Sequence, residues 1–511
     1  MVVGSRLRGF WENPVTNLPC QVSPDRTARK IKKMIWHITK RELYDHLNSL
    51  RFAFTMILLL VLMIVNAIGY LGKYKAQSAA YQKKVSMSLN KMRSNADTLY
   101  NLLIAGPGTL YKKPSALSFC TSSSETFIPE SADGVSDRSV MLPTRFSFKA
   151  IWRMEYPQSN PNLWNIMPDY TNVDWSNIIS VVLSLIAILF TFDAISSEQG
   201  HGTLRLILSN SVSRGTVLLS KFLTALITIS IPFLMTALIN LFLLYTSGSI
   251  SFGPSECGRL GVIVLIAFVY VSIFLGLGLL ISSCVSNSST SLTILLLIWT
   301  FWVVLLPSTL GTMTSGLQPT MTSAEFNARW QSLYQNLDAQ YIRRRHDDKT
   351  PSREIPATEG TLFWTKYIVE DAKRNESLNE EYLDAQIAQI QLARSITRIS
   401  PASSVRYAIE SLAGTGFTRH VQFLKQVRRY AGEFRTFLIE TDRADPESPH
   451  ALGPKEGTSQ KPVRFESIPK FEDRISFSGA YNTAATDILL LLLFFVVLFA
   501  GAFLFFIRVD I

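Results

Sequence analysis

Six long apolar blocks constrain this chain more than any other feature of its sequence. They cover residues 52–72, 177–195, 217–246, 259–282, 291–310 and 487–507. An α-helix needs about 20 mostly apolar residues to cross the roughly 30 Å hydrocarbon core of a bilayer. The last block is the clearest, because residues 488–507 are Leu, Ile, Val or Phe apart from two Ala and one Gly. The blocks therefore predict six transmembrane helices.

The overall composition supports a membrane protein. The chain has 511 residues, of which 47% are hydrophobic and 17% charged, whereas soluble domains are about 25% charged. Helices buried in a soluble core are the alternative, but the apolar residues are gathered into blocks without central charges, which disfavours it. The predicted fold class is an all-α membrane protein with six transmembrane helices and a mainly helical extracytoplasmic domain.

Charge near the first apolar block predicts the orientation. Residues 1–51 are rich in Lys and Arg, including RKIKK at 29–33, so the positive-inside rule places them in the cytoplasm. An even number of spans then puts both termini there. Ile31, Met34, Ile35 and Ile38 recur at helical spacing, which favours an amphipathic helix in the membrane surface over a short soluble helix. We read the net charge of +11 as a topology signal and a contact with anionic lipid; no nucleic-acid surface is expected.

This orientation assigns the connecting segments. Residues 73–176 and 311–486 are expected outside the cytoplasm, and residues 193–216 inside it. The outer segments show helical patterns over 73–104, 322–346, 361–398 and 417–440, and the residues between 104 and 176 look irregular. Residues 442–462 are rich in Pro, Gly, Ser and charge and are expected to form a flexible loop.

Cysteine usage leaves one question open. Cys20 and Cys284 are expected on the reducing side of the membrane. Cys120 and Cys257 are expected outside, where they could form a disulfide, but a sequence does not give their separation.

Motifs for enzyme chemistry are missing from the sequence. It contains neither a GxxxxGK[ST] phosphate loop nor an HExxH zinc helix, and HDD at 346–348 reads as a solvated helix end rather than a metal site. No apolar block has an ionisable residue near its middle, which disfavours a proton- or sodium-coupled carrier. Thr224, Thr228, Thr236, Asn240 and Ser272 are expected to hydrogen-bond between helices. We expect no enzyme activity, metal or cofactor in this chain.

One short segment between the second and third spans is unusual. Residues 193–216 carry Asp193, Ser196 and Ser197, which can cap a short helix whose N-terminal end Glu198 would favour. Gly200 and Gly202 allow a sharp turn or close approach. Apolar residues follow, and these are too hydrophobic to be left in water: Leu204, Leu206, Ile207 and Leu208. The pattern indicates a protruding segment that docks in a groove of another protein, although an interfacial helix without a partner has the same features.

This segment has a recognisable family pattern. The string FDAISSEQGHGTLRLILSNSVSRGTVLLSKFL (192–223) resembles the coupling-helix region of ABC-2 type permeases, the membrane subunits of ATP-binding-cassette exporters. YKKPSALSF (111–119) and SPASSVRYAIESLAGTG (400–416) resemble outer-domain stretches of the subgroup with enlarged outer loops that is associated with multi-copper enzyme maturation. His201 departs from the pattern, since the family more often has Arg or another polar residue there.

The resemblance implies a function and a set of coupling residues. A separate cytoplasmic ATPase subunit would bind ATP and Mg²⁺, and two permease subunits, identical or paralogous, would pair in a bacterial cytoplasmic (inner) membrane. The implied coupling residues are Asp193, Glu198, Gly200, His201, Gly202, Thr203 and Arg205. Export of an unidentified substrate is the expected activity. Two alternatives stay open: ATP-driven force relay to a periplasmic partner without transport, and a membrane scaffold without an ATPase.

Overall fold

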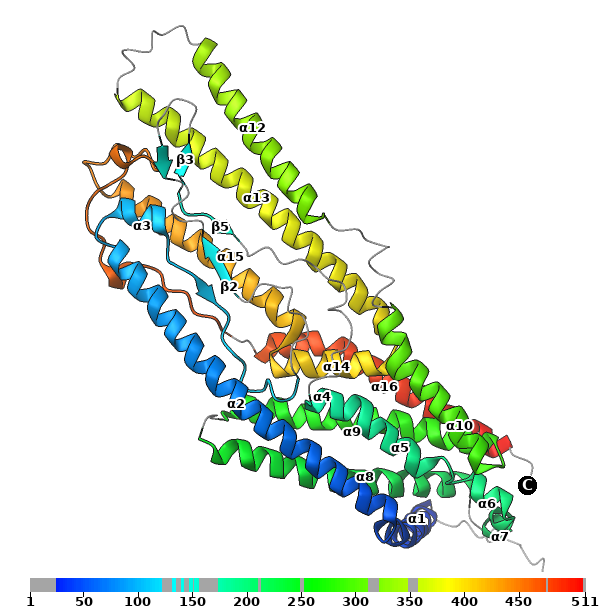
Figure 1. The fold of residues 1–511 in the computed structure, drawn as a ribbon. Helices are drawn as coiled ribbons and strands as arrows, with labels where there is room; N and C mark the ends of the chain where they lie inside the picture. Colours follow the sequence, from blue (N-terminus) through cyan, green and yellow to red (C-terminus); the bar gives the residue numbers. More distant parts are fainter. Residues whose placement is uncertain are drawn as a thin grey trace, which may run out of the picture.

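The chain forms a helical membrane bundle with a long helical arm at one end (Figure 1). The computed structural model describes residues 24–121, 131–134, 139–141, 147–149, 151–155, 173–209, 213–248, 252–310, 321–347, 357–474 and 477–508. Within these ranges, six helices are long and apolar enough to cross a membrane: Leu50–Asn95, Trp175–Gly200, Arg214–Thr246, Pro254–Cys284, Ser288–Leu310 and Gly479–Arg508. The predicted fold class is confirmed.

Each candidate span consists of one helix or of consecutive helical segments. Span 1 is α2 (Leu50–Asn95), span 3 is α8 (Arg214–Thr246), span 4 is α9 (Pro254–Cys284) and span 6 is α16 (Phe477–Arg508). Span 2 combines α4 (Trp175–Asn177), the π-helical η2 (Ile178–Leu183) and α5 (Ser184–Thr191). Span 5 combines α10 (Ser288–Trp299) with the π-helical η3 (Thr300–Leu305).

Helix α9 lies at the centre of the bundle and packs against α5, α8, α10 and α16. Its Tyr270 and Phe274 are fully buried. Gly278 permits close approach to span 2, because a Cβ atom there would lie 1.9 Å from Thr191 Oγ1. Gly276 faces the backbone of α16, and a Cβ atom there would make an ordinary contact, 3.6 Å from Phe499 N. Close packing of α9 against span 2 thus depends on the glycine at position 278.

The five polar residues predicted to bond between helices are all hydrogen-bonded, but mostly not as predicted. Asn240 Nδ2 donates across to Met63 O at 2.7 Å and Asn66 Oδ1 at 3.0 Å, as expected for helix–helix bonding. The other four side chains instead donate to the carbonyl four residues earlier in their own helix: Thr224, Thr228, Thr236 and Ser272. A hydroxyl is short enough to reach its own helix backbone, so these four do not tie spans together.

The arm contains α3 (Leu99–Ala105), α12 (Ser323–Asp347), α13 (Ala357–Thr397) and α15 (Gly416–Arg443), together with the C-terminal half of α2. Its core is separate from that of the bundle and is built around Trp152, Phe423 and Phe434. Helix α14 (Pro401–Ala413) joins α13 to α15 and lies between the arm and the bundle (Figure 1).

Short strands occupy part of the region expected to be irregular. β1 (Leu110–Tyr111), β2 (Ser131–Gly134) and β5 (Met154–Glu155) form an antiparallel sheet in the order β1-β2-β5, with Leu110 opposite Ala132. β3 (Ser139–Met141) pairs with β4 (Ser147–Lys149). Such short strands are too brief for the alternation of apolar and polar residues that reveals a strand in a sequence.

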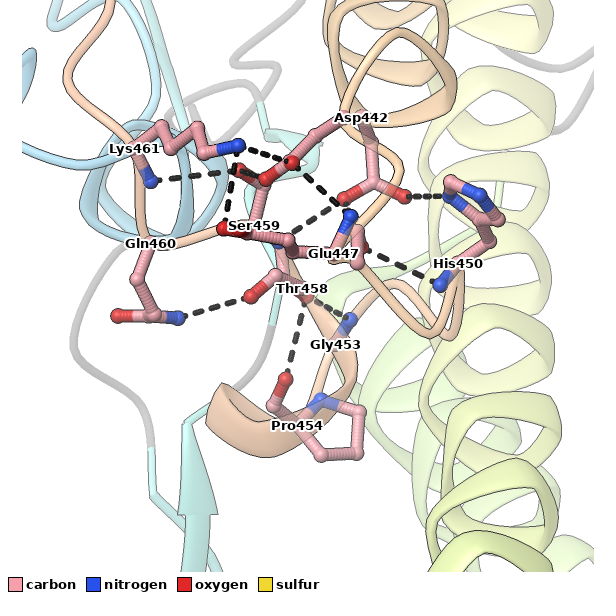
Figure 2. Close-up of polar contacts among 11 residues, drawn as sticks. Asp442, Glu447, His450, Gly453, Pro454, Thr458, Ser459, Gln460 and Lys461 are labelled. Atoms are coloured by element: carbon pink, nitrogen blue, oxygen red, sulfur yellow. Dashed lines mark hydrogen bonds and ion pairs between the residues drawn. The ribbon is translucent and has the colours of Figure 1, made fainter.

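The loop expected to be flexible, residues 442–462, is instead tightly bonded. Asp442 is 1% exposed and accepts hydrogen bonds from Ser459 N at 2.9 Å and Ser448 Oγ at 2.8 Å. His450 Nδ1 lies 3.2 Å from the same carboxylate (Figure 2). Nearby, the hydrogen bond from Lys461 lowers the pKa of Asp445 to about 2. The loop, which includes the 3₁₀ turn η4 (Lys455–Gly457), is thus organised around a buried carboxylate.

Within the described residues, Cys120 is a buried free thiol and Cys257 an exposed free thiol. The possible disulfide between them is therefore not formed in this structure. Cys20 lies outside the described residues.

The arm should lose stability in mild acid because His420 of α15 is buried. Burial lowers the pKa of His420 well below its usual range, and the nearby cations of Lys112 and Arg419 lower it further. Lys112 Nζ lies 2.7 Å from His420 Nε2. The unfolded chain takes up a proton below about pH 6.5 while the folded chain does not, so stability is complete above that pH and falls below it.

We expect this loss to reach about 1.4 kcal/mol for each pH unit below 6.5. It is measured by thermal unfolding of the full chain in detergent between pH 7.5 and 5.5, with wild type compared against His420→Gln. The amide oxygen of Gln still accepts from Lys112 but does not titrate, so the variant should show the shallower pH dependence. Parallel curves for the two proteins would contradict the prediction. Burial also lowers the pKa of His46, but this contribution is the same in both proteins and cancels in the comparison.

Candidate functional site

The predicted coupling segment forms two short helices at the end of the bundle opposite the arm. The chain turns after span 2 and continues as α6 (Ser196–Gly200) and α7 (Thr203–Ser209). Figure 1 shows these helices beside α1 (Pro24–Leu47) and the C-terminal end of α16. Residues 210–212 lie outside the described residues, and Ser213 caps the start of α8.

The N-terminus of α6 is capped by another span. Ile195 N and Ser196 N both donate to Ser282 Oγ of α9, at 2.9 Å and 3.0 Å. The prediction that Asp193, Ser196 or Ser197 supplies the cap is wrong, because Ile195 takes the capping position and the acceptor comes from α9. A cap provided by a different helix fixes α6 in space as well as starting it.

The turn between α9 and α10 holds the rest of α6. Ser196 Oγ lies 3.1 Å from Ser288 Oγ, and Gln199 Nε2 donates to Ser283 O at 3.4 Å. A Cβ atom on Gly200 would lie 3.2 Å from Ser286 O, so glycine allows the close approach predicted from the sequence. Gly202 adopts a φ of 71°, a conformation that favours glycine, and it turns the chain into α7.

Glu198 points back toward the membrane bundle. Its Oε1 lies 2.8 Å from Lys221 Nζ of α8, and Lys221 also pairs with Glu42 of α1 at 3.1 Å. The Lys221 side chain is only 7% exposed. Lys221 therefore connects α6, α8 and α1 through one buried ammonium group, and Glu198 serves as an internal anchor.

Asp193 makes a second ionic link. Arg51 of α2 lies 2.8 Å from the Asp193 carboxylate and also donates to Leu189 O at 3.2 Å. Its guanidinium lies 5.0 Å from the centre of the Phe192 ring. Both side chains of this pair are partly exposed, so the link contributes about 1 kcal/mol or less to stability. Its effect is to hold the end of span 2 against α2.

The remaining predicted residues form an exposed front. His201, Gly202, Thr203 and Arg205 are all exposed. His201 Nδ1 lies 2.7 Å from Ser197 O, which fixes the orientation of the ring. Leu206 is 68% exposed, whereas Leu204 is 1% exposed and packs inward. The side chains of Ile207 and Leu208 lie outside the described residues. This arrangement gives a polar surface with an apolar residue in it, held on a rigid base.

The seven predicted site residues thus divide into two groups with different contacts. Asp193 and Glu198 tie the segment to the spans and Gly200 allows it to pack closely, while His201, Gly202, Thr203 and Arg205 face outward. The supporting residues Ser282, Lys221, Arg51 and Glu42 were not predicted. A lysine inside an apolar block, as Lys221 is, was the one sequence signal that could have revealed this network.

Within the described residues, no group of three or more His, Cys, Asp or Glu side chains is placed to hold a metal ion. The side chains of residues 346–348, the HDD motif, lie outside them.

Comparisons with known proteins give a family match. The model of a family described as ABC-2 family transporter protein matches residues 36–511, which is most of the chain. No curated protein matches the sequence.

The cap supplied by Ser282 gives a direct test of how α6 is held. Ser282→Ala would leave two buried backbone N–H groups without an acceptor, at a cost of about 1–3 kcal/mol. We expect amide hydrogen exchange of residues 195–200 to become roughly 5–150 times faster in the variant. Ser283→Ala is the matched control, because Ser283 Oγ donates only within its own helix, to Leu280 O. Equal exchange in both variants would contradict the assigned cap.

Proposed function

Since this multi-pass membrane chain belongs to the ABC-2 transporter family, we propose that it is the permease subunit of an ATP-binding-cassette exporter. A separate cytoplasmic subunit binds and hydrolyses ATP with Mg²⁺, and it docks on α6 and α7. The observation that carries this proposal is the two-sided character of the segment. Its back is fixed to spans by Ser282 and Lys221, and its front presents Arg205 and Leu206.

Coupling requires that the docked ATPase bind one conformation of the permease more strongly than another. If the segment moved independently of the spans, this difference in binding energy would not change the conformation of the spans. Here the attachments of α6 reach α8 and α1 through Lys221, and α9 and α10 through Ser282 and Ser288. Closure of the ATPase therefore moves four helices together through one short helix.

The wider assembly follows from the same proposal. A second permease, identical or paralogous, pairs with this one in a bacterial inner membrane, and both termini face the cytoplasm. Basic residues of α1 contact anionic lipid. Large apolar side chains on α2, α8, α10 and α16 are exposed and supply surface for lipid or the second permease, for example Phe54, Ile57, Leu238, Phe242, Leu297, Leu493 and Val496. Membership of the multi-copper enzyme maturation subgroup rests on the outer sequence stretches 111–119 and 400–416.

Docking is tested by changing the exposed front while leaving the anchors intact. Leu206→Asp places a charge where an apolar contact is proposed, and we expect at least a tenfold loss of affinity for the ATPase subunit. The measurement is binding between the purified permease and the ATPase encoded beside it, in detergent. Because Leu206 is exposed, the variant should fold normally.

Lys91→Glu is the control for this experiment, because it reverses a charge on an exposed residue of α2 in the arm. We expect it to bind the ATPase as wild type does. Normal binding by the Leu206→Asp variant would remove the support for a docking surface on α7. Failure of any ATPase to bind the wild-type protein would favour the scaffold alternative.

Transmission is tested at the internal anchor. Glu198→Lys replaces an attraction to the buried Lys221 with a repulsion, so α6 loses its link to α8 and α1. We expect the variant to insert and bind the ATPase, but with ATP turnover of the assembled complex reduced about tenfold, within the usual range of coupling energies. Glu198→Gln keeps the size of the side chain without adding a charge, and it should show a smaller defect. Full turnover in both variants would show that this ion pair has no part in coupling.

A further inference from the structure

The strongest unexplained feature of the structure is the nearly complete burial of α14. Of its thirteen residues, all except Arg406 are buried. The helix carries arginine and glutamate side chains and lies at the arm end of the bundle, where a simple connection from α13 to α15 could have stayed in water. It packs against α9 and α16, and also against α4, η2 and η3. Such a helix joins the arm to the bundle across a large contact surface.

Helix α14 is fixed to α13 as one bent unit. Arg394 of α13 pairs with Glu410 of α14 at 2.9 Å, and both side chains are buried. The Arg394 guanidinium also lies 3.8 Å from the centre of the Tyr407 ring, and Tyr407 OH lies 2.7 Å from Thr397 Oγ1. Breaking a buried ion pair by removing one partner is strongly unfavourable, so the angle between α13 and α14 is held firmly.

The same helix is bonded to the outer ends of spans 2 and 5. Arg406 Nη2 donates to Asn177 Oδ1 at the start of span 2, at 2.6 Å. Ser400 Oγ donates to Trp302 O in the π-helical part of span 5, also at 2.6 Å. Arg398, at the junction of α13 and α14, pairs with Asp487 of span 6 at 2.6 Å. Helix α14 is therefore attached to several spans at once.

The inner ends of spans 2 and 5 meet at the coupling segment. Span 2 leads directly into α6, and span 5 begins at Ser288, whose hydroxyl contacts Ser196 of α6. These two spans thus touch α6 at one end of the bundle and α14 at the other. Both contain their π-helical segment next to α14, and such segments are frequent at functional sites.

We propose that α14 transmits movement from the bundle to the arm. Spans 2 and 5 carry the movement of α6 to α14, and α14 in turn moves the hairpin formed by α12 and α13. The hairpin is joined to the rest of the arm by exposed ion pairs, such as Arg428 with Asp384 at 2.7 Å, and by the buried pair of Asp371 with Arg153 at 3.1 Å. Leu383 and Ile390 of α13 also lie in the core that α15 shares. These contacts must yield or shift when α14 displaces α13. This inference rests on the proposed function, because an ATPase must supply the movement at α6. It goes further in naming a mechanical output outside the membrane.

The test measures the distance between the hairpin and the rest of the arm during the ATPase cycle. Spin labels are placed at Lys373→Cys in α13 and Lys91→Cys in α2, both exposed positions. Cys20, Cys257 and Cys284 are replaced by Ser, and the buried Cys120 is kept. Pulsed electron paramagnetic resonance on the full complex with its ATPase compares the nucleotide-free state with the ATP–vanadate state. We expect the mean distance to shift on the order of 5 Å, the scale of known helix displacements.

Variants show whether α14 carries the movement. Arg398→Gln with Arg406→Gln removes the links from this joint to spans 6 and 2, and we expect it to abolish at least half of the distance shift. Arg329→Gln is the matched control, since Arg329 pairs with Glu381 inside the hairpin at 2.9 Å and should leave the shift unchanged. If the double variant does not assemble, Ser400→Ala removes the bond to span 5, together with the cap that Ser400 Oγ gives Ala402 N, and should reduce the shift.

The outcomes separate this inference from the proposed function. If the wild-type complex hydrolyses ATP while the distance between the labels stays constant, the proposed movement of the hairpin by α14 is refuted and the permease assignment stays intact. A shift that persists in full in the assembled joint variants would show that α14 is not the carrier. A complex without ATP turnover would refute both the proposed function and the proposed movement of the hairpin.

Discussion

The hydrocarbon core of the membrane has no water to satisfy polar groups, and this constraint shapes the whole protein. It forces the spans into helices, and it requires each polar side chain between them to find a partner inside the protein. Asn240 meets this requirement by bonding across to α2, and the span threonines meet it within their own helix. At the two ends of the bundle, the same requirement draws charged side chains into fixed pairs, such as Lys221 with Glu198 and Arg398 with Asp487.

These end pairs fix particular helices to one another. Inside the bundle, contact between spans is mostly apolar, and apolar surfaces can slide past one another with little directional preference. A buried ion pair, in contrast, loses much of its favourable energy when its partners separate. Lys221 joins three helices at the end of the bundle next to α6, and the residues around α14 join α13 to spans 2, 5 and 6 at the opposite end. The positions of the charges therefore define the rigid units.

The sequence alone predicted the features that depend on local pattern. Long apolar runs identified six spans, and helical spacing identified most of the arm helices. Patterns failed where a contact comes from a distant part of the chain. The cap of α6 is Ser282, 86 residues from Ser196, and no local motif indicates it. Residues 442–462 have the composition of a disordered linker, yet the buried carboxylate of Asp442 organises them (Figure 2). The roles of the exposed residues His201 and Arg205 stay predictions.

Glu198 shows why a family resemblance needs the structure beside it. The resemblance marks the residue as part of a coupling motif, and a charged residue in a docking segment is readily taken for a contact with the partner. In the structure its carboxylate turns inward to a buried lysine, so its charge is used to attach the segment and not to recognise another molecule. The exposed residues in front of it are His201, Gly202, Thr203, Arg205 and Leu206, and in the proposed docking these make the contact with the partner. On the proposed function, the docking surface can change without changing how the segment is connected to the membrane, because the exposed residues and the anchoring residues lie on opposite sides of one short segment.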